Sequence, residues 1–74
     1  MPKIPVLKAV KLLRVLKQLG FYSYHQSGSH IQMRHADGRR TTVPFHASHD
    51  IGRKTLKSII DDLGLTIEEF TKEI

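Results

Sequence analysis

The sequence predicts a small α+β domain in which helices cover one face of a three-stranded antiparallel sheet. Apolar residues recur at helical spacing near both ends of the chain, whereas the middle alternates polar and apolar residues with the period of a strand. The chain has 74 residues, of which 39% are hydrophobic, and this suits a single globular domain over residues 1–74. The length excludes a Rossmann fold, a TIM barrel and a two-domain enzyme.

The first helix is expected to begin between Val6 and Ala9 and to end at Gly20. Glycine commonly follows the last turn of a helix because it adopts a positive φ without strain. One face of this segment is apolar at spacings of three and four residues, as a helix packed on a core requires. Its members are Ala9, Leu12, Leu13, Leu16 and Leu19.

Three strands joined by two short turns are expected to follow. In the second strand Ile31 and Met33 should face the core, because successive side chains of a strand point to opposite sides. His30, Gln32 and Arg34 then share the other, open face. The strands are expected at residues 21–26, 30–35 and 39–43, with turns at 27–29 and 36–38 and a proline closing the third strand at residue 44.

A second helix and a short additional C-terminal helix are predicted after the strands. The second helix has an apolar stripe at helical spacing and ends at Gly64. Thr66 and Glu69 have the spacing of a capping box, which opens the last helix. The predicted buried positions are Leu56, Ile59, Ile60 and Leu63 in the second helix, and Ile67, Phe70 and Ile74 in the last.

The charge distribution favours a polyanionic partner. The chain carries 12 Lys and Arg against 7 Asp and Glu, which gives a net charge of +5. Residues 1–54 hold a formal charge of +8, and residues 55–74 hold −3. A basic body of this kind indicates nucleic acid as the first candidate partner, and a merely solvated basic surface is the alternative.

Two further features limit where the protein acts. The chain has no cysteine, so disulfides, thiolate nucleophiles and cysteine-based zinc sites are excluded, and a reducing cytoplasm is the expected compartment. Lysine or arginine at positions 8, 11, 14 and 17 interrupts the apolar N-terminal segment. No membrane-spanning helix and no membrane partner are therefore expected.

The five histidines do not have the pattern of a metal site. His30 and His35 should point to opposite faces of one strand, because their separation is odd. His46 and His49 are close in sequence, but Asp50 is the only adjacent carboxylate. Zinc sites are built from three or four such ligands, so no metal and no cofactor are expected.

His30 has a distinct position, at the start of a strand directly after Gly28 and Ser29. An imidazole exchanges protons near neutral pH, and Arg34 and Arg40 could hold phosphates on the same face. RNA supplies its own nucleophile, the 2′-hydroxyl, so its cleavage needs proton transfer but no metal. The residues alone favour the simpler alternative, a surface histidine that stabilises the turn.

Several short motifs, in a fixed order, carry a resemblance to a known family. The chain contains Leu19-Gly20-Phe21, Gly28-Ser29-His30, Asp37-Gly38-Arg39, Val43-Pro44, His46, Thr55-Leu56-Lys57-Ser58-Ile59, and a tail that runs from Gly64 to Phe70. This series resembles the HicA toxin family over roughly residues 8–70. The family often has basic residues at the positions that Ser27 and His25 occupy here.

The resemblance implies a fold like that of double-stranded-RNA-binding domains, with the element order α-β-β-β-α. It also implies that the protein is the toxin of a type II toxin–antitoxin system and acts as a metal-independent endoribonuclease that cleaves mRNA. The family's catalytic histidine, in its Gly-Ser-His motif, falls on His30, as general base or general acid. A HicB-type antitoxin is expected to cover the His30 face in a hetero-oligomer. The residues expected to contact RNA or its phosphates are Gly28, Ser29, Gln32, Arg34, Arg39 and Arg40.

Two alternatives from other functional classes stay open at this point. The first is a non-catalytic RNA-binding module of the same fold, which would read the shape of RNA. The second is a purely protein-binding role for the basic face. Tyr22 and Tyr24 fall on one face of the first strand, where they could stack on bases, but at least one of them is expected to pack under the helices.

Overall fold

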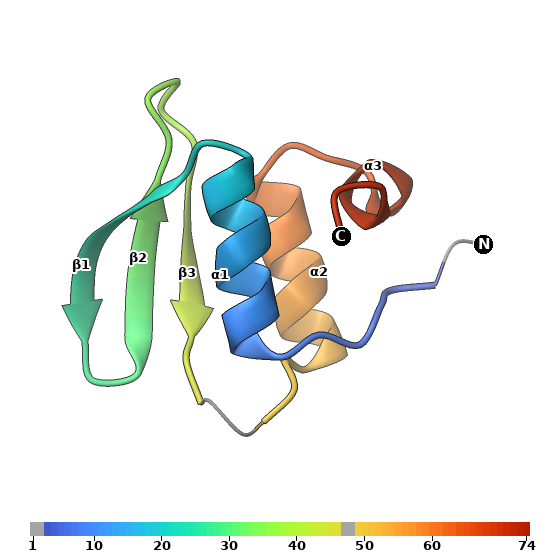
Figure 1. Cartoon of the computed structure of the whole chain (residues 1–74), viewed down its shortest axis with the longest axis horizontal. Helices are drawn as coiled ribbons and strands as arrows, with labels where there is room; N and C mark the ends of the chain where they lie inside the picture. Colours follow the sequence, from blue (N-terminus) through green and yellow to red (C-terminus); the bar gives the residue numbers. More distant parts are fainter. Residues whose placement is uncertain (1–2, 47–48) are drawn as a thin grey trace.

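The computed structural model of the chain describes residues 3–46 and 49–74 and has the α+β architecture that the sequence predicts (Figure 1). One helix is followed by three strands and then by two helices, the last of them short. None of the helices in these residues is long and apolar enough to cross a membrane. The elements are α1 (Ala9–Gln18), β1 (Tyr22–Ser27), β2 (His30–Arg34), β3 (Arg40–Pro44), α2 (Arg53–Asp62) and α3 (Ile67–Thr71).

The three strands form one antiparallel sheet in the order β1-β2-β3. Ser27 pairs with His30, so the loop between β1 and β2 has only two residues. Gly28, the first of them, has a φ of 57°, as the type II′ turn of a tight hairpin requires. The β1–β2 register shifts between Ser23 and His25, which makes Tyr24 the extra residue of a β-bulge.

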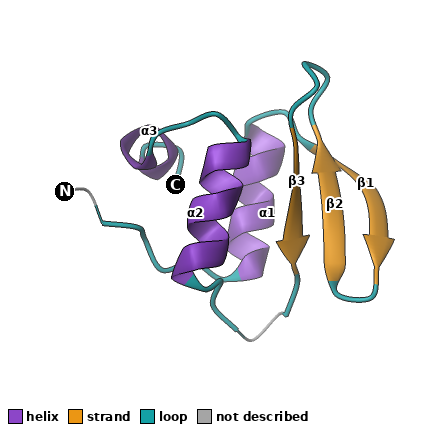
Figure 2. Cartoon of the chain, turned by 180° about the vertical axis from the view of Figure 1, so that it is seen from behind, coloured by secondary structure: helices purple, strands orange, loops and turns teal. Residues whose placement is uncertain are grey.

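The helices lie on one face of the sheet, as predicted, but they cover it unevenly. Both α1 and α2 pack against β3, whereas β1 lies at the far side of the sheet from them (Figures 1 and 2). Every residue of β1 is exposed. In β2 and β3, by contrast, exposed and buried residues alternate, because one face of these two strands meets the helices.

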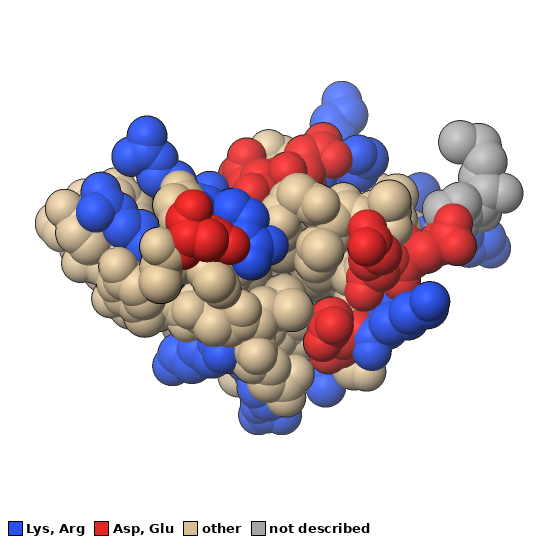
Figure 3. Space-filling model, turned by 90° about the horizontal axis from the view of Figure 1, so that it is seen from above, with Lys and Arg blue, Asp and Glu red and all other residues tan. Residues whose placement is uncertain are grey.

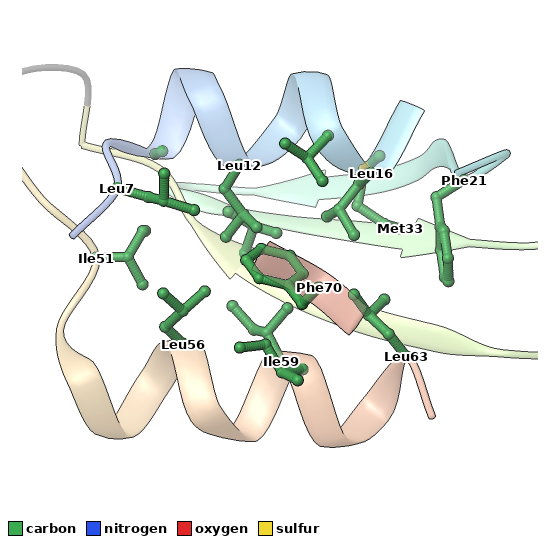
Figure 4. Packing of buried hydrophobic residues seen from close by; sticks show 14 of the residues in the cluster. Leu7, Leu12, Leu16, Phe21, Met33, Ile51, Leu56, Ile59, Leu63 and Phe70 are labelled. Carbon is green, nitrogen blue, oxygen red and sulfur yellow. The ribbon is translucent and has the colours of Figure 1, made fainter. Parts of the chain in front are cut away.

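The core lies between the sheet and the helices (Figure 4). Phe70 reaches it from the short helix α3 and is fully buried, with no exposed surface. The predicted core positions of α2 and the second strand are confirmed. The largest fully buried side chains are Phe70, Leu12, Leu16, Met33, Leu56, Ile60, Leu63, Val15 and Val43.

The ends of the elements differ from prediction at a few residues. Pro44 is the last residue of β3 rather than the residue after it, which an edge strand tolerates because a proline lacks an N–H donor. The capping box of α3 is confirmed, with Thr66 and Glu69 bonded reciprocally. The prediction for Ile74 is wrong: α3 ends at Thr71, and Ile74 lies beyond it with 44% of its surface exposed.

Candidate functional site

The side of the sheet that faces away from the helices is here called the open face. In antiparallel strands, directly paired residues share a face, and His30, Gln32 and Arg34 alternate with the buried Ile31 and Met33. The register therefore assigns the remaining members, except Tyr24, which has no register partner and is assigned by its contact with the Arg34 guanidinium. The open face consists of Tyr22, Tyr24, His25 and Ser27 from β1, His30, Gln32 and Arg34 from β2, and Arg40, Thr42 and Pro44 from β3.

His30 is held on this face by the backbone around it. It is the first residue of β2 and pairs with Ser27 on one side and Pro44 on the other. The preceding turn is fixed from both flanks: Gln26 Nε2 donates to the Gly28 carbonyl at 3.2 Å, and the Phe45 N–H donates to the carbonyl of Ser29. Within residues 3–46 and 49–74 the exposed imidazole makes no hydrogen bond, so no described residue occupies either ring nitrogen.

Arg34 and Arg40 are brought together at the other end of the open face. They are register partners on β2 and β3. Arg34 lies four residues from His30, which is about 13 Å at the rise of a β-strand. Arg34 and Arg40 thus share a face with His30 but are separated from it by most of the length of β2.

Arg34 also stacks on an aromatic ring from the neighbouring strand. Its guanidinium carbon lies 3.5 Å from the centroid of the Tyr24 ring. The expectation that Tyr22 or Tyr24 packs under the helices is wrong, since the two side chains are 51% and 53% exposed. The reason is that the helices do not reach β1.

Arg39 differs from its neighbour Arg40 because two of its side-chain donors are bonded inside the protein. Its Nε donates to Asp37 Oδ2 at 2.8 Å, and its Nη1 donates to the Leu63 carbonyl at 2.6 Å. The guanidinium also lies 5.2 Å from the centroid of the Phe21 ring. These contacts tie the β2–β3 turn to the C-terminal end of α2, and so the structure gives Arg39 a structural role.

The contacts with Arg39 also lower the pKa of Asp37. The backbone N–H of Arg39 donates to Asp37 Oδ1 at 3.0 Å and is the main cause that lowers the pKa of Asp37, with the guanidinium of Arg39 adding to the effect. Hydrogen bonds to a carboxylate favour its charged form. Asp37 is therefore a stabilised anion next to the turn, and it neutralises Arg39 rather than Arg34 or Arg40.

The other histidines have different surroundings. His35 is half-buried, with Nε2 at 3.1 Å from the Leu19 carbonyl, and His25 is exposed on the open face opposite Gln32. The rings of His46 and His49 are 6.0 Å apart. Across the described residues, no group of three or more His, Asp or Glu side chains is arranged to hold a metal ion.

A groove runs beside the open face where α2 flanks the sheet. The strands contribute Gln32, Arg34, Arg40 and Thr42 to its lining, and α2 contributes Lys54 and Ser58. At its floor the buried Thr41 donates its hydroxyl to Asp62 Oδ2 at 2.9 Å. Sequence reasoning missed Lys54 and Ser58, because only the packing of α2 beside β3 brings them to the strands.

Charge is distributed unevenly over the molecule. Figure 3 looks down on the end with the β2–β3 turn, and there most acidic side chains lie toward α2 and α3 rather than over the sheet. Five of the 7 acidic residues belong to residues 55–74. The open face itself contains Arg34 and Arg40 and no carboxylate. An anionic ligand on the open face would meet these basic groups, and the nearest acidic side chain in the adjoining groove is Asp62, which accepts a hydrogen bond from Thr41.

These features define a class of protein: a small α-β-β-β-α domain that exposes one polar and basic face of its sheet. The chain belongs to the HicA toxin family of bacterial toxin–antitoxin systems, since the family model described as "HicA toxin of bacterial toxin-antitoxin" matches residues 9–65. Membership gives the chain the general role of a toxin paired with an antitoxin. The comparison with curated proteins finds no match.

Proposed function

We propose that this toxin is an endoribonuclease that cleaves messenger RNA, with His30 as the residue that moves a proton. The observation that carries the proposal is the placement of His30. Its imidazole is exposed and has no hydrogen-bond partner among the described residues. It lies at the start of β2, on the same face as Arg34 and Arg40. A histidine that only stabilised the turn would be bonded to it. The substrate is a polyanion, which matches the basic open face.

The reaction follows from the chemistry of RNA. The 2′-hydroxyl attacks the adjacent phosphorus, the bond to the 5′-oxygen of the next nucleotide breaks, and a 2′,3′-cyclic phosphate and a free 5′-hydroxyl remain. His30 either accepts the proton of the 2′-hydroxyl or donates one to the leaving 5′-oxygen, and water exchanges the other proton. A positioned general acid or base contributes about 10²–10⁴-fold to such a rate, and no metal is needed in this scheme.

Holding the substrate is the task of the remaining open-face residues. Gly28 lacks a side chain and is exposed next to His30, so a phosphate can approach the backbone of the turn, with Ser29 beside it. Gln32 lies one strand step from His30, at about 7 Å. Arg34 and Arg40 contact phosphates farther along the strand of RNA. Arg39 is left out of this set, because Asp37 pairs with its charge and the Leu63 carbonyl binds a second of its donors.

The antitoxin of this pair is, in this proposal, a HicB-type protein that covers the open face and with it His30. Such a partner inhibits by excluding RNA, and acidic side chains on it would complement Arg34 and Arg40. The complex is a hetero-oligomer. Messenger RNA as substrate places the activity in the cytoplasm.

The test compares three antitoxin-free proteins: wild type, His30→Ala and His49→Ala. Each is incubated with a mixed-sequence RNA in the presence of EDTA, and the cleavage products are resolved on a gel. His49 is a matched control, since it is exposed and immediately precedes Asp50, which bridges to Lys8 at the start of α1. We expect cleavage by wild type and by the control, and none by His30→Ala. Equal cleavage by His30→Ala would remove His30 from the mechanism.

The alternative of a non-catalytic RNA-binding module is separated by the same assay. If folded wild-type protein binds RNA with a steep salt dependence and leaves it uncut, the module is favoured over the nuclease.

A further inference from the structure

We infer that the open face binds unpaired RNA, with a base stacked on the Tyr24–Arg34 pair, so that these two residues form a nucleotide-binding subsite remote from His30. The inference rests on the proposed function for the identity of the substrate as RNA. It adds the form of RNA that the site takes and a specificity-determining residue, Tyr24.

The exposure of the two tyrosines is the first observation. A tyrosine ring normally buries a large apolar area, yet Tyr22 and Tyr24 are each about half exposed. Both lie on the open face, as Tyr22 is the register partner of Arg34 and Tyr24 contacts the Arg34 guanidinium. Two exposed aromatic rings beside basic groups are the arrangement on which single-stranded nucleic acids stack.

The β-bulge is the second observation. In a regular strand Tyr22 and Tyr24 would alternate with His25 on the opposite face. The register shift between Ser23 and His25 instead leaves Tyr24 as an extra residue and brings His25 to the open face opposite Gln32. Bulges are frequent next to binding sites, where they redirect a side chain. Here the bulge gathers two rings and an imidazole on one side of β1.

The third observation is that the Arg34 guanidinium stacks on Tyr24 while its N–H donors stay unbonded among the described residues. The guanidinium carbon lies over the Tyr24 ring, 3.5 Å from the ring centroid. A guanidinium that stacks on an aromatic face keeps its N–H donors in its own plane, available for hydrogen bonds. In the part of the chain that the structure describes, none of these donors takes part in a hydrogen bond or ion pair. A base on the ring face opposite Arg34 and a phosphate on the guanidinium can therefore be bound together.

Such a subsite selects unpaired RNA for a geometric reason. In a duplex the flat faces of the bases are covered by their neighbours, and proteins read the duplex through phosphates and 2′-hydroxyls. Only a strand with splayed bases presents a face to Tyr24. Arg34 is about 13 Å from His30 along β2, so the unpaired stretch must extend beyond the scissile phosphate by more than one nucleotide.

The experiment uses His30→Ala protein, which leaves the RNA intact, and an end-labelled RNA as a single strand or annealed to its complement. Fluorescence anisotropy gives the affinities. We expect the single strand to bind more tightly than the duplex, and the added change Tyr24→Ala to weaken single-strand binding by about tenfold or more. Tyr24→Phe should retain it, since the ring face is kept. Val10→Ala, on an exposed position of α1, is the matched control and should have no effect.

A second readout reports stacking directly. The chain has 2 tyrosines and no tryptophan, so the tyrosine ring signals in an NMR spectrum come only from Tyr22 and Tyr24, and Tyr22→Phe assigns them. Upfield shifts on adding the single strand are expected. Equal affinity for duplex and single strand, or unchanged binding by folded Tyr24→Ala, would overturn the inference.

Failure of this inference differs from failure of the proposed nuclease. If wild type and Tyr24→Ala cut and bind RNA equally, the subsite is wrong and the nuclease stands. If wild type leaves RNA uncut while single strands still bind through Tyr24, the subsite stands and the nuclease is wrong.

Discussion

The imidazole of His35 lies so close to Gly20 that a β-carbon on Gly20 would come within 2.8 Å of its Nε2. The ring also joins two parts of the fold: Nε2 is 3.1 Å from the Leu19 carbonyl, and Nδ1 accepts from the Asp37 N–H at 3.0 Å. The contact with the Leu19 carbonyl requires a proton on Nε2, and Asp37 Oδ1 also lies 3.1 Å from Nδ1. His35 therefore supports the end of α1 and the β2–β3 turn, whereas His30 makes no such bonds to the described residues.

Replacing Gly20 by alanine should destabilise the protein for two separate reasons. Gly20 has a φ of 99°, which side chains adopt at a cost, and the new methyl group would push on His35. Gly38 is a matched control, with a φ of 98° and nothing within 4 Å of the place that a β-carbon would take. We expect Gly38→Ala to lose about 1–2 kcal/mol of unfolding free energy and Gly20→Ala to lose clearly more, measured by urea denaturation. Equal losses would show that the contact with His35 costs nothing.

Adjacent arginines should behave in opposite ways. Arg39→Gln breaks the contacts with Asp37 and the Leu63 carbonyl, so we expect a loss of about 1–3 kcal/mol in stability and little change in RNA binding. Arg40→Gln, at an exposed position of the open face, should leave the melting temperature unchanged and reduce the salt slope of RNA binding by about one. A reduced slope for Arg39→Gln at unchanged stability would restore Arg39 as an RNA contact.

The stability of the fold should decrease at acidic pH. The Thr66 N–H donates to Glu69 Oε1 at 2.9 Å and lowers the pKa of Glu69, and the pKa of Asp37 is lowered as well. A carboxyl whose pKa is lower in the folded state stabilises the protein above its unfolded pKa, and this contribution is lost as the pH falls through the folded pKa. The ordinary values are 4.5 for Glu69 and 3.8 for Asp37, so the loss falls below about pH 4.5.

Thermal melts of wild type and Glu69→Gln, taken from about pH 6 down to pH 2.5, check this expectation. Glutamine keeps the hydrogen bonds of the capping box but has no charge. The variant should melt at a lower temperature than wild type near neutral pH, and the difference should close under acid conditions. A difference that is constant over the whole range would mean that the ionisation of Glu69 does not contribute.

Gly28 should matter to cleavage through the backbone alone. Its φ is 57°, and a β-carbon added there would meet nothing within 4 Å, so Gly28→Val strains the turn without a steric clash. Misplacing the following His30 by about 1 Å can cost about 10²-fold in rate, and we expect a fall of that order in RNA cleavage. Gly64→Val is the matched control: its φ is 73°, it also lies in open space, and it belongs to the α2–α3 turn. It should lose stability and keep its cleavage rate.

The parts of the fold that the sequence predicted well are those with one buried face. Ile31 and Met33 alternate with His30, Gln32 and Arg34, and a period of two assigns each side chain to a face without further information. The capping box of α3 was equally clear, because both of its hydrogen bonds join residues that are close in the sequence.

The sequence could not predict features that depend on how distant elements meet. β1 is exposed on both faces, so its residues had no pattern to show that the helices leave it uncovered or that Tyr24 is a bulge. Arg39 and Arg40 are adjacent residues of the same type, so the sequence gives them the same expected role. They differ in the structure because the C-terminal end of α2 lies within hydrogen-bond distance of Arg39. The groove beside β3 exists because α2 brings Lys54 and Ser58 to the strands.

The antitoxin and the RNA should compete for the open face. If the antitoxin covers Arg34 and Arg40, replacing both by glutamate puts like charges against an acidic partner, which costs several kcal/mol. We expect the double variant Arg34→Glu, Arg40→Glu to lose about 100-fold or more in affinity for the antitoxin, measured by calorimetry, and to lose RNA binding with it. The control reverses two exposed basic residues of α1, Arg14→Glu and Lys17→Glu, and should bind the antitoxin almost as wild type does. A partner that contacts the open face must respond when the charges of Arg34 and Arg40 are reversed. An antitoxin that binds the first variant with wild-type affinity, and still blocks RNA cleavage by the wild-type toxin, would therefore have to bind another surface.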